Sequence, residues 1–290
     1  MSLDRLINLL VTITLIEMMV LIGLRVTFTE LVDTVRNVRL VVRAAAANYL
    51  LVPALAIALL ILVDASPMVA AGVLVLAVCP GAPFGPPFAG IARANVPEAV
   101  GLMAILAGSS AVVSPLLLNA LLPWLGGGAA ARIDLVGMVS VLLITQLLPL
   151  LLGLLVRHHG PRLADRLTNP LELASKILNL SVAGVILATQ FQMLTQIRAL
   201  GFLGMLMLLA GSLVIGWLAG EPGRDRRRTM ALTTSLRNVG VGLVIVTGNF
   251  AGTPAVSAAL AYGIFEVLGS LLVALWWRRS AQSGFRPSLP

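Results

Sequence analysis

The sequence predicts an all-α polytopic membrane protein, and three observations lead to this class. Hydrophobic residues make up 59% of the 290 residues and charged residues only 11%, so the mean hydropathy is +1.01; a water-soluble domain needs a far more polar surface. The apolar residues gather in runs of about 20, the length of a helix that crosses a bilayer core. The basic residues lie in short links between these runs, so membrane topology explains the net charge of +8 and no nucleic-acid partner is expected.

These runs predict nine membrane-spanning segments. The first contains Glu17 and lacks a small-residue cleavage site, which favours a membrane helix over a secretion signal. The predicted segments are 7–27, 38–62, 67–92, 97–122, 134–156, 170–193, 199–219, 229–250 and 254–277.

The links between the segments alternate in charge. Arginines follow the odd-numbered segments, whereas the only basic residues in the links after even-numbered segments are Arg132 and Arg198. Basic links stay in the cytoplasm, so we expect the N-terminus outside and the C-terminus inside. A single lysine among many arginines and alanines indicates a GC-rich bacterial source, and therefore the inner membrane.

Two segments contain breaks that a simple span would not have. Segment 67–92 contains CPGAPFGPPFAG, with four prolines and three glycines, and segment 229–250 contains TTSLRNVGVG. Each is followed by a short link and a helix that starts with proline. The same order of broken segment, short link and proline-started helix in both halves predicts an inverted repeat. The first repeat is predicted to span residues 1–125 with four helices and the second residues 130–280 with five. Residues 281–290 are predicted to form a cytoplasmic tail.

The breaks themselves predict a substrate cavity. Proline removes a helix hydrogen bond, and irregular backbone persists at membrane depth only where protein or a water-filled cavity surrounds it. Exposed half-helix ends there can hold ions and anionic groups. A simple proline kink is the alternative, but four prolines and a second break in the other half favour a substrate-cavity crossover.

The same motifs resemble those of the bile acid:sodium symporter family. The run CPGAPFGPPFAGIARAN followed by a helix ending in SPLL is similar to the family's first crossover. LRNVGVGL followed by GSLL is similar to its second crossover and last helix, and ANYLLVP at 47–53 to its first core helix. The resemblance implies a panel bundle and a core bundle, alternating access, and transport of a small organic anion. Members that lack the first helix have nine, as predicted here.

The resemblance also gives positions for two sodium sites, and most lack a suitable side chain. The first-site positions are Gly85, Pro86, Ala99, Met103 and Thr233; the second-site positions are Asn48, Thr234, Leu236 and Arg237. Thr233 and Asn48 offer oxygen atoms, but Arg237 has no acceptor and is always charged. It would repel a cation 4 Å away by about 4 kcal/mol at an effective dielectric constant near 20. Sodium coupling through the family's side chains is therefore not expected.

Arg237 has two interpretations that the sequence leaves open. Its charge either replaces the bound sodium and attracts a carboxylate or sulfonate, or is neutralised by a structural carboxylate, with Glu266 the first candidate and Glu98 the next. Both glutamates are also candidate coupling groups. The expected substrate-binding residues are Asn48, Gly81, Phe84, Gly85, Pro86, Thr233, Thr234, Arg237, Asn238 and Glu266. Phe84 and Phe88 either line the substrate cavity or simply pack against neighbouring side chains.

Other classes of function receive less support. The sequence has no metalloprotease, serine-hydrolase or paired-aspartate motif and no His/Cys cluster, so no enzyme, metal or cofactor is expected. The leading prediction is a secondary transporter of a small organic anion in the lipid bilayer. The alternatives are a sodium-coupled, bile acid-like symporter and a membrane sensor of the same fold that moves no substrate.

Overall fold

The structure, a computed structural model, describes residues 3–125, 134–195 and 199–283, and this part of the chain is helical without strands. Its helices are α1 Leu3–Arg25, α2 Phe28–Arg36, α3 Val38–Ala46, α4 Val52–Leu62, α5 Pro67–Ala77, α6 Gly85–Ile91, α7 Val96–Leu121, α8 Leu135–Leu142, α9 Leu148–His159, α10 Pro161–Thr195, α11 Ala199–Ala219, α12 Arg224–Ser235, α13 Val239–Asn249 and α14 Pro254–Ser283.

Eight helical stretches within the described ranges are long and apolar enough to cross a membrane. They are Arg5–Arg25, Val38–Leu62, Val96–Trp124, Leu135–His159, Pro161–Thr189, Leu200–Ala219, Arg224–Asn249 and Pro254–Ser280. The predicted all-α polytopic class is confirmed, and the chain is an integral membrane protein. Segment 67–92 is not one of the eight, because it consists of two short helices, α5 and α6, around an irregular stretch.

Two stretches predicted as links are helical. Helix α2 was not predicted; it begins with a capping box in which Thr27 and Glu30 satisfy each other's backbone N–H groups. Helix α10 begins at Pro161 rather than 170, because proline at a helix start needs no hydrogen-bond partner for its nitrogen. The basic link before segment 170–193 is therefore largely part of a helix.

Prolines also explain two π-helical turns inside the spans. The turns Ala47–Leu51 and Leu143–Leu147 directly precede α4 and α9, which carry Pro53 and Pro149 in their first turns. Proline has no N–H to donate to the preceding turn, and a single wider turn accommodates the missing bond. Each turn carries one fully buried amide side chain, Asn48 or Gln146.

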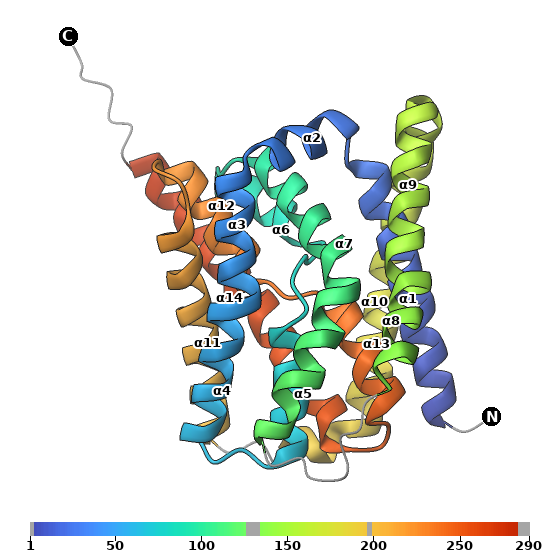
Figure 1. Ribbon diagram of the computed structural model, residues 1–290, viewed down its shortest axis with the longest axis vertical. Coiled ribbons are helices and arrows are strands. Elements are labelled where there is room, and N and C mark those ends of the chain that lie inside the picture. The colour runs from blue at the N-terminus through green and yellow to red at the C-terminus, as the bar shows by residue number, and fades with distance from the viewer. Residues whose placement is uncertain (1–2, 126–133, 196–198, 284–290) are drawn as a thin grey trace.

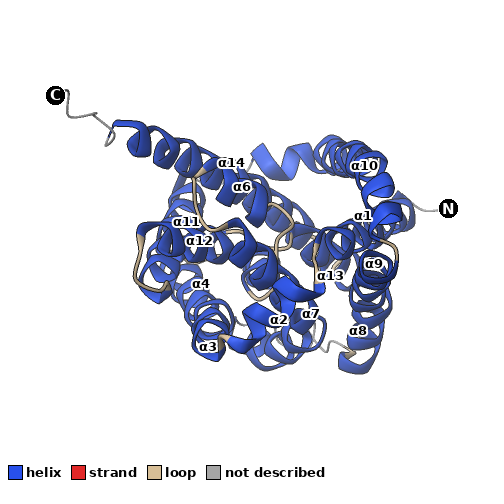
Figure 2. Ribbon diagram, turned by 90° about the horizontal axis from the view of Figure 1, so that it is seen from above, coloured by secondary structure: helices blue, strands red, loops and turns tan. Residues whose placement is uncertain are grey.

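The helices form a smaller and a larger bundle (Figure 2). The smaller bundle consists of α1, α8, α9 and α10, and α1 packs along both α9 and α10. In the larger bundle, α11 packs on α4 and α12, and α14 packs on α5. Helix α2 passes from α1 to α3 and packs on α7, so it joins the two bundles at one end of the molecule (Figure 1).

The described ends of the chain lie at opposite ends of the long axis (Figure 1). Helix α1 begins at the lower end in this view, whereas α14 ends at the upper end and packs on α12. Arginines of α2, α3 and α12 belong to the upper end. This polarity is what the predicted orientation requires, and the orientation, the inverted repeat and the number nine stay predictions.

Candidate functional site

The two irregular stretches meet near the middle of the long axis (Figure 1). We call them together the crossover: residues 78–84, between α5 and α6, and residues 236–238, between α12 and α13. The backbone N–H of Asn238 donates to the Cys79 carbonyl at 2.7 Å, and its side-chain Nδ2 donates to the Gly81 carbonyl at 3.2 Å. The broken segments therefore hydrogen-bond to each other.

The first half of the crossover has an unusual backbone conformation and lies against α7. Gly81 has φ +89°, and a side chain there would overlap the backbone of Ala107 on α7. Ser114, also on α7, donates to the Val78 carbonyl at 2.6 Å. Only glycine combines this conformation with this close approach, so the glycine predicted as a site residue has a structural role.

Arg237 lies at the centre of the crossover with no exposed surface. Its guanidinium donates to the carbonyl of Ala77, the last residue of α5, at 3.3 Å, and to the carbonyl of Thr234 near the end of α12. The carbonyl end of a helix carries a partial negative charge of about half a unit. Two such ends facing one guanidinium offset much of its charge, which explains how a membrane-depth arginine is accommodated.

Glu266 contacts Arg237 in a way that the sequence did not predict. Its Oε1 accepts the backbone N–H of Arg237 at 2.7 Å, and its Oε2 has no hydrogen-bond partner. Among the described residues, no ion pair joins the Arg237 guanidinium to a carboxylate. Glu266 thus places a buried carboxylate beside Arg237 through the backbone N–H, and the two interpretations of the Arg237 charge stay predictions.

Polar side chains of α12 and the first π turn surround the carbonyl ends. Asn48 donates to the Ala44 carbonyl at 2.9 Å and reaches Thr234 Oγ1 at 3.5 Å, while its Oδ1 has no partner. Thr233 Oγ1 donates to the Thr229 carbonyl at 2.9 Å. Ser235 hydrogen-bonds Ser270 of α14 at 3.1 Å. The structure thus brings Asn48 and Thr234 together with Arg237, as the resemblance implies.

The residues at the start of α6 pack rather than line an open cavity. Gly85 and Pro86 are buried, and a side chain on Gly85 would touch the Thr233 methyl group at 3.5 Å. The Phe84 and Phe88 rings lie 6.0 Å apart and pack in one apolar cluster with Leu232. Both rings therefore pack in this conformation, and a role of Phe84 and Phe88 in lining a substrate cavity stays a prediction.

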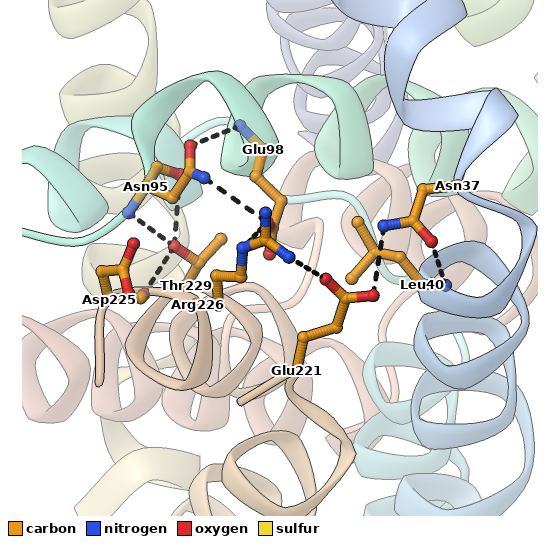
Figure 3. A network of polar contacts seen from close by, with 8 residues as sticks. All are labelled: Asn37, Leu40, Asn95, Glu98, Glu221, Asp225, Arg226 and Thr229. Carbon is orange, nitrogen blue, oxygen red and sulfur yellow. Dashed lines mark hydrogen bonds and ion pairs between the residues drawn. The ribbon is translucent and has the colours of Figure 1, made fainter. Parts of the chain in front are cut away.

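Glu98 lies in a separate polar network that joins the start of α7 to α12 (Figure 3). Its Oε2 is 3.8 Å from Nε of Arg226, which also pairs with Glu221. Asn95 joins α7 to α12 by donating its backbone N–H to Thr229 Oγ1 at 2.9 Å. Glu98 therefore pairs with the start of α12, and the structure does not bring it to Arg237.

Two buried polar groups near the crossover were not predicted from the sequence. Tyr262 lies one helical turn before Glu266, on the same face of α14, and is fully buried. Gln146 of the second π turn donates to Ser110 of α7 at 2.7 Å. Both are single polar residues within apolar runs, which is the signal that could have identified them.

The described residues hold no group of three or more His, Cys, Asp or Glu side chains that could bind a metal ion. Cys79 is a buried free thiol. The electrostatic centre of the described site therefore consists of a guanidinium, helix-end carbonyls and one carboxylate.

Comparisons with known proteins agree with the motifs. A family model described as the Sodium Bile acid symporter family matches residues 12–197. The chain is 22% identical over 273 residues to "Probable sodium/metabolite cotransporter BASS2, chloroplastic" from Oryza sativa subsp. japonica, covering 93% of this chain and 64% of the rice protein. It is 23% identical over 276 residues to "Uncharacterized sodium-dependent transporter YocS" from Bacillus subtilis (strain 168), and this match covers 94% of this chain and 84% of the Bacillus protein. The chain thus spans less than two thirds of the rice relative.

Proposed function

The chain belongs to the sodium bile acid symporter family, and from this we propose that it is a secondary transporter of a small organic anion that works by alternating access. The two relatives are named as a cotransporter and a transporter, which supports a transport role. The bacterial relative and the basic end of the molecule favour a bacterial inner membrane with that end in the cytoplasm.

One observation carries the proposal that sodium is not coupled through the family's side chains. The Arg237 guanidinium donates to the Thr234 carbonyl, which the resemblance assigns to the second sodium site. The protein thus supplies its own cation where the family would bind one. A sodium ion 4 Å from this charge would be repelled by about 4 kcal/mol at an effective dielectric constant near 20. We infer that Arg237 holds the two half-helices together in place of the ion.

The same guanidinium is the best candidate to recognise the substrate. It is fully buried, and its Nε has no hydrogen-bond partner. A carboxylate or sulfonate could take over the place of a carbonyl once a movement between the bundles opens the crossover, because guanidinium binds such groups in a bidentate manner. Glu266 would keep its bond to the Arg237 backbone, so substrate binding does not require Glu266 to leave.

Sodium-coupled symport is the second candidate function, and two observations favour it. Both relatives carry sodium in their names. Asn48 Oδ1 and Glu266 Oε2 are buried oxygen atoms without hydrogen-bond partners, and sodium prefers oxygen ligands. Proton coupling through Glu266 or Glu98 is a further form of the leading proposal, because both carboxylates have an unpartnered buried oxygen.

Arg237→Gln distinguishes these candidates, because the resemblance places glutamine at this position. We expect wild-type thermal stability in detergent to be the same in sodium chloride and choline chloride at equal ionic strength. The variant should be stabilised by sodium, by about 3 °C or more when sodium is about tenfold above its Kd. Arg224→Gln, at the exposed start of α12, is the matched control and should show no sodium effect. Sodium-specific stabilisation of the wild type would overturn the proposal.

Flux into proteoliposomes tests transport itself. A panel of carboxylates and a conjugated bile acid is offered with and without sodium, and uptake of at least one anion without sodium is expected. An anion that stabilises the protein but never crosses the membrane would contradict transport and favour the sensor.

A further inference from the structure

A basic groove lies on the outer face of the larger bundle, away from the smaller one. It has a volume of about 590 Å³ and lies between α3 with its π turn and the upper end of α11. Its lining is Arg43, Ala46, Ala47, Leu51, Ile215, Leu218, Ala219, Gly220, Pro222 and Arg227. We call it the Arg43–Arg227 groove. Figure 2 shows α3 and α11 on the side opposite α1, α9 and α10, so this face does not meet the smaller bundle.

The groove combines apolar walls with two cations. Leu51 and Leu218 are 52% and 76% exposed. Arg43 and Arg227 are both exposed, and among the described residues neither forms an ion pair. The Arg227 guanidinium lies 5.9 Å from the centre of the Trp217 ring, which restrains its position. The result is a hydrophobic trough with a positive end.

The π turn contributes to the groove and also contacts α12, the helix that ends at the crossover. Ala47 belongs to this turn and lines the groove, while the next residue, Asn48, points inward to Thr234 on α12. Arg227 lies on α12 itself. A ligand that joins Arg43 to Arg227 would therefore tie α3 to α12, the helix that ends at the crossover.

We propose that the Arg43–Arg227 groove binds one anionic phospholipid, with its phosphate between the two arginines and an acyl chain along Leu51 and Leu218. A membrane-spanning protein presents such a face to the bilayer, so the occupant must have an apolar part. Guanidinium is well matched to phosphate, and basic pockets between membrane helices bind acidic headgroups. The lining of the groove includes arginines of α3 and α12, two helices that carry several arginines toward the upper end in Figure 1.

Lipid-dependent thermal stability of the detergent-purified full chain tests this site. Dioleoyl phosphatidylglycerol is titrated against dioleoyl phosphatidylcholine at constant ionic strength. Phosphatidylglycerol should raise the unfolding temperature of the wild type by about 3 °C or more, and phosphatidylcholine should not. Arg43→Gln and Arg227→Gln should each weaken the apparent affinity about fivefold, since one arginine near a charged surface contributes about that factor.

Matched control variants lie on the same two helices outside the groove. Arg39→Gln on α3 and Arg224→Gln on α12 remove the same charge from exposed positions and should leave the lipid response unchanged. An equal loss in these controls would show diffuse surface attraction and overturn the site. Stabilisation by inorganic phosphate alone, or equally by phosphatidylcholine, would also overturn it. Leu218→Ser provides a second check, because it should weaken phosphatidylglycerol binding without changing charge.

Discussion

Arg237 shows how a single residue can be both costly and useful at membrane depth. A central arginine costs about 3 kcal/mol on insertion scales, yet this one is fully buried. Two helix-end carbonyls accept its guanidinium donors, and Glu266 accepts its backbone N–H. Arg237 thus has acceptors from α5, α12 and α14: two carbonyls accept from its guanidinium, and one carboxylate accepts from its backbone N–H.

Glu266→Gln tests this arrangement at the scale of the residue. The amide keeps an acceptor for the Arg237 N–H but removes the carboxylate that lies beside the buried guanidinium, so we expect a loss of about 3 kcal/mol in the free energy of unfolding. The apparent unfolding temperature, followed by tryptophan fluorescence, should fall by about 6 °C or more. Glu172→Gln is the control, since Glu172 pairs with Arg25 at 2.7 Å in a partly exposed position and should cost below about 1 kcal/mol. Equal effects of the two variants would contradict a structural role for the Glu266 charge.

At the scale of the elements, prolines and glycines determine where helices stop and how closely they approach. Prolines interrupt segment 67–92 and accompany both π turns. Asn238 then restarts the second broken helix, because its Oδ1 accepts the Val241 N–H at 3.2 Å and caps α13. The crossover therefore consists of one interruption in each of two helical segments, rather than a kink in a single helix.

Gly81→Ala tests the backbone geometry of the crossover. The substitution forces a left-handed conformation on alanine and drives its Cβ into the Ala107 backbone, so a loss of more than about 2 kcal/mol is expected. Gly184→Ala in α10 is the matched control, because a side chain there meets nothing within 4 Å. It should stabilise by about 0.5–1 kcal/mol. Thermal unfolding that shifts in the same direction for both variants would contradict this account.

At the scale of the whole molecule, the asymmetric distribution of arginine is the main sign of orientation. The basic end carries α2, the polar network of Figure 3 and the Arg43–Arg227 groove. In that network, Asn37 of the α2–α3 link donates to Glu221 at 3.2 Å, so α3, α7 and α12 are connected at one level. These contacts join three helices of the larger bundle at its basic end.

Cysteine labelling in right-side-out vesicles tests the predicted orientation. Ser66→Cys lies in the link between α4 and α5, and Ser280→Cys lies near the end of α14; both positions are exposed. An impermeant maleimide should label Ser66→Cys and should label Ser280→Cys only after detergent is added. The wild type is the control, because its single cysteine, Cys79, is fully buried. The reverse pattern would place the C-terminus outside.

Much of the architecture was predictable because membrane insertion depends on local composition. The apolar runs predicted the spanning helices, and the proline and glycine clusters predicted both breaks. Helix α2 and the early start of α10 were missed, since their polar faces resemble links. The packing of Phe84 against Phe88 and the contact of Glu98 with Arg226 could not be predicted, because periodicity does not say which neighbouring helix a side chain meets.

The sequence by itself determined the membrane class, the positions of the two breaks and the presence of one charged residue within the second. These properties depend on hydropathy and backbone chemistry over a few neighbouring residues. Only the tertiary structure decided that Arg237 meets the carbonyls of Ala77 and Thr234, and that Glu266 binds its backbone instead of its guanidinium. These contacts join residues up to 160 positions apart, so they exist only after α5, α12 and α14 have packed together.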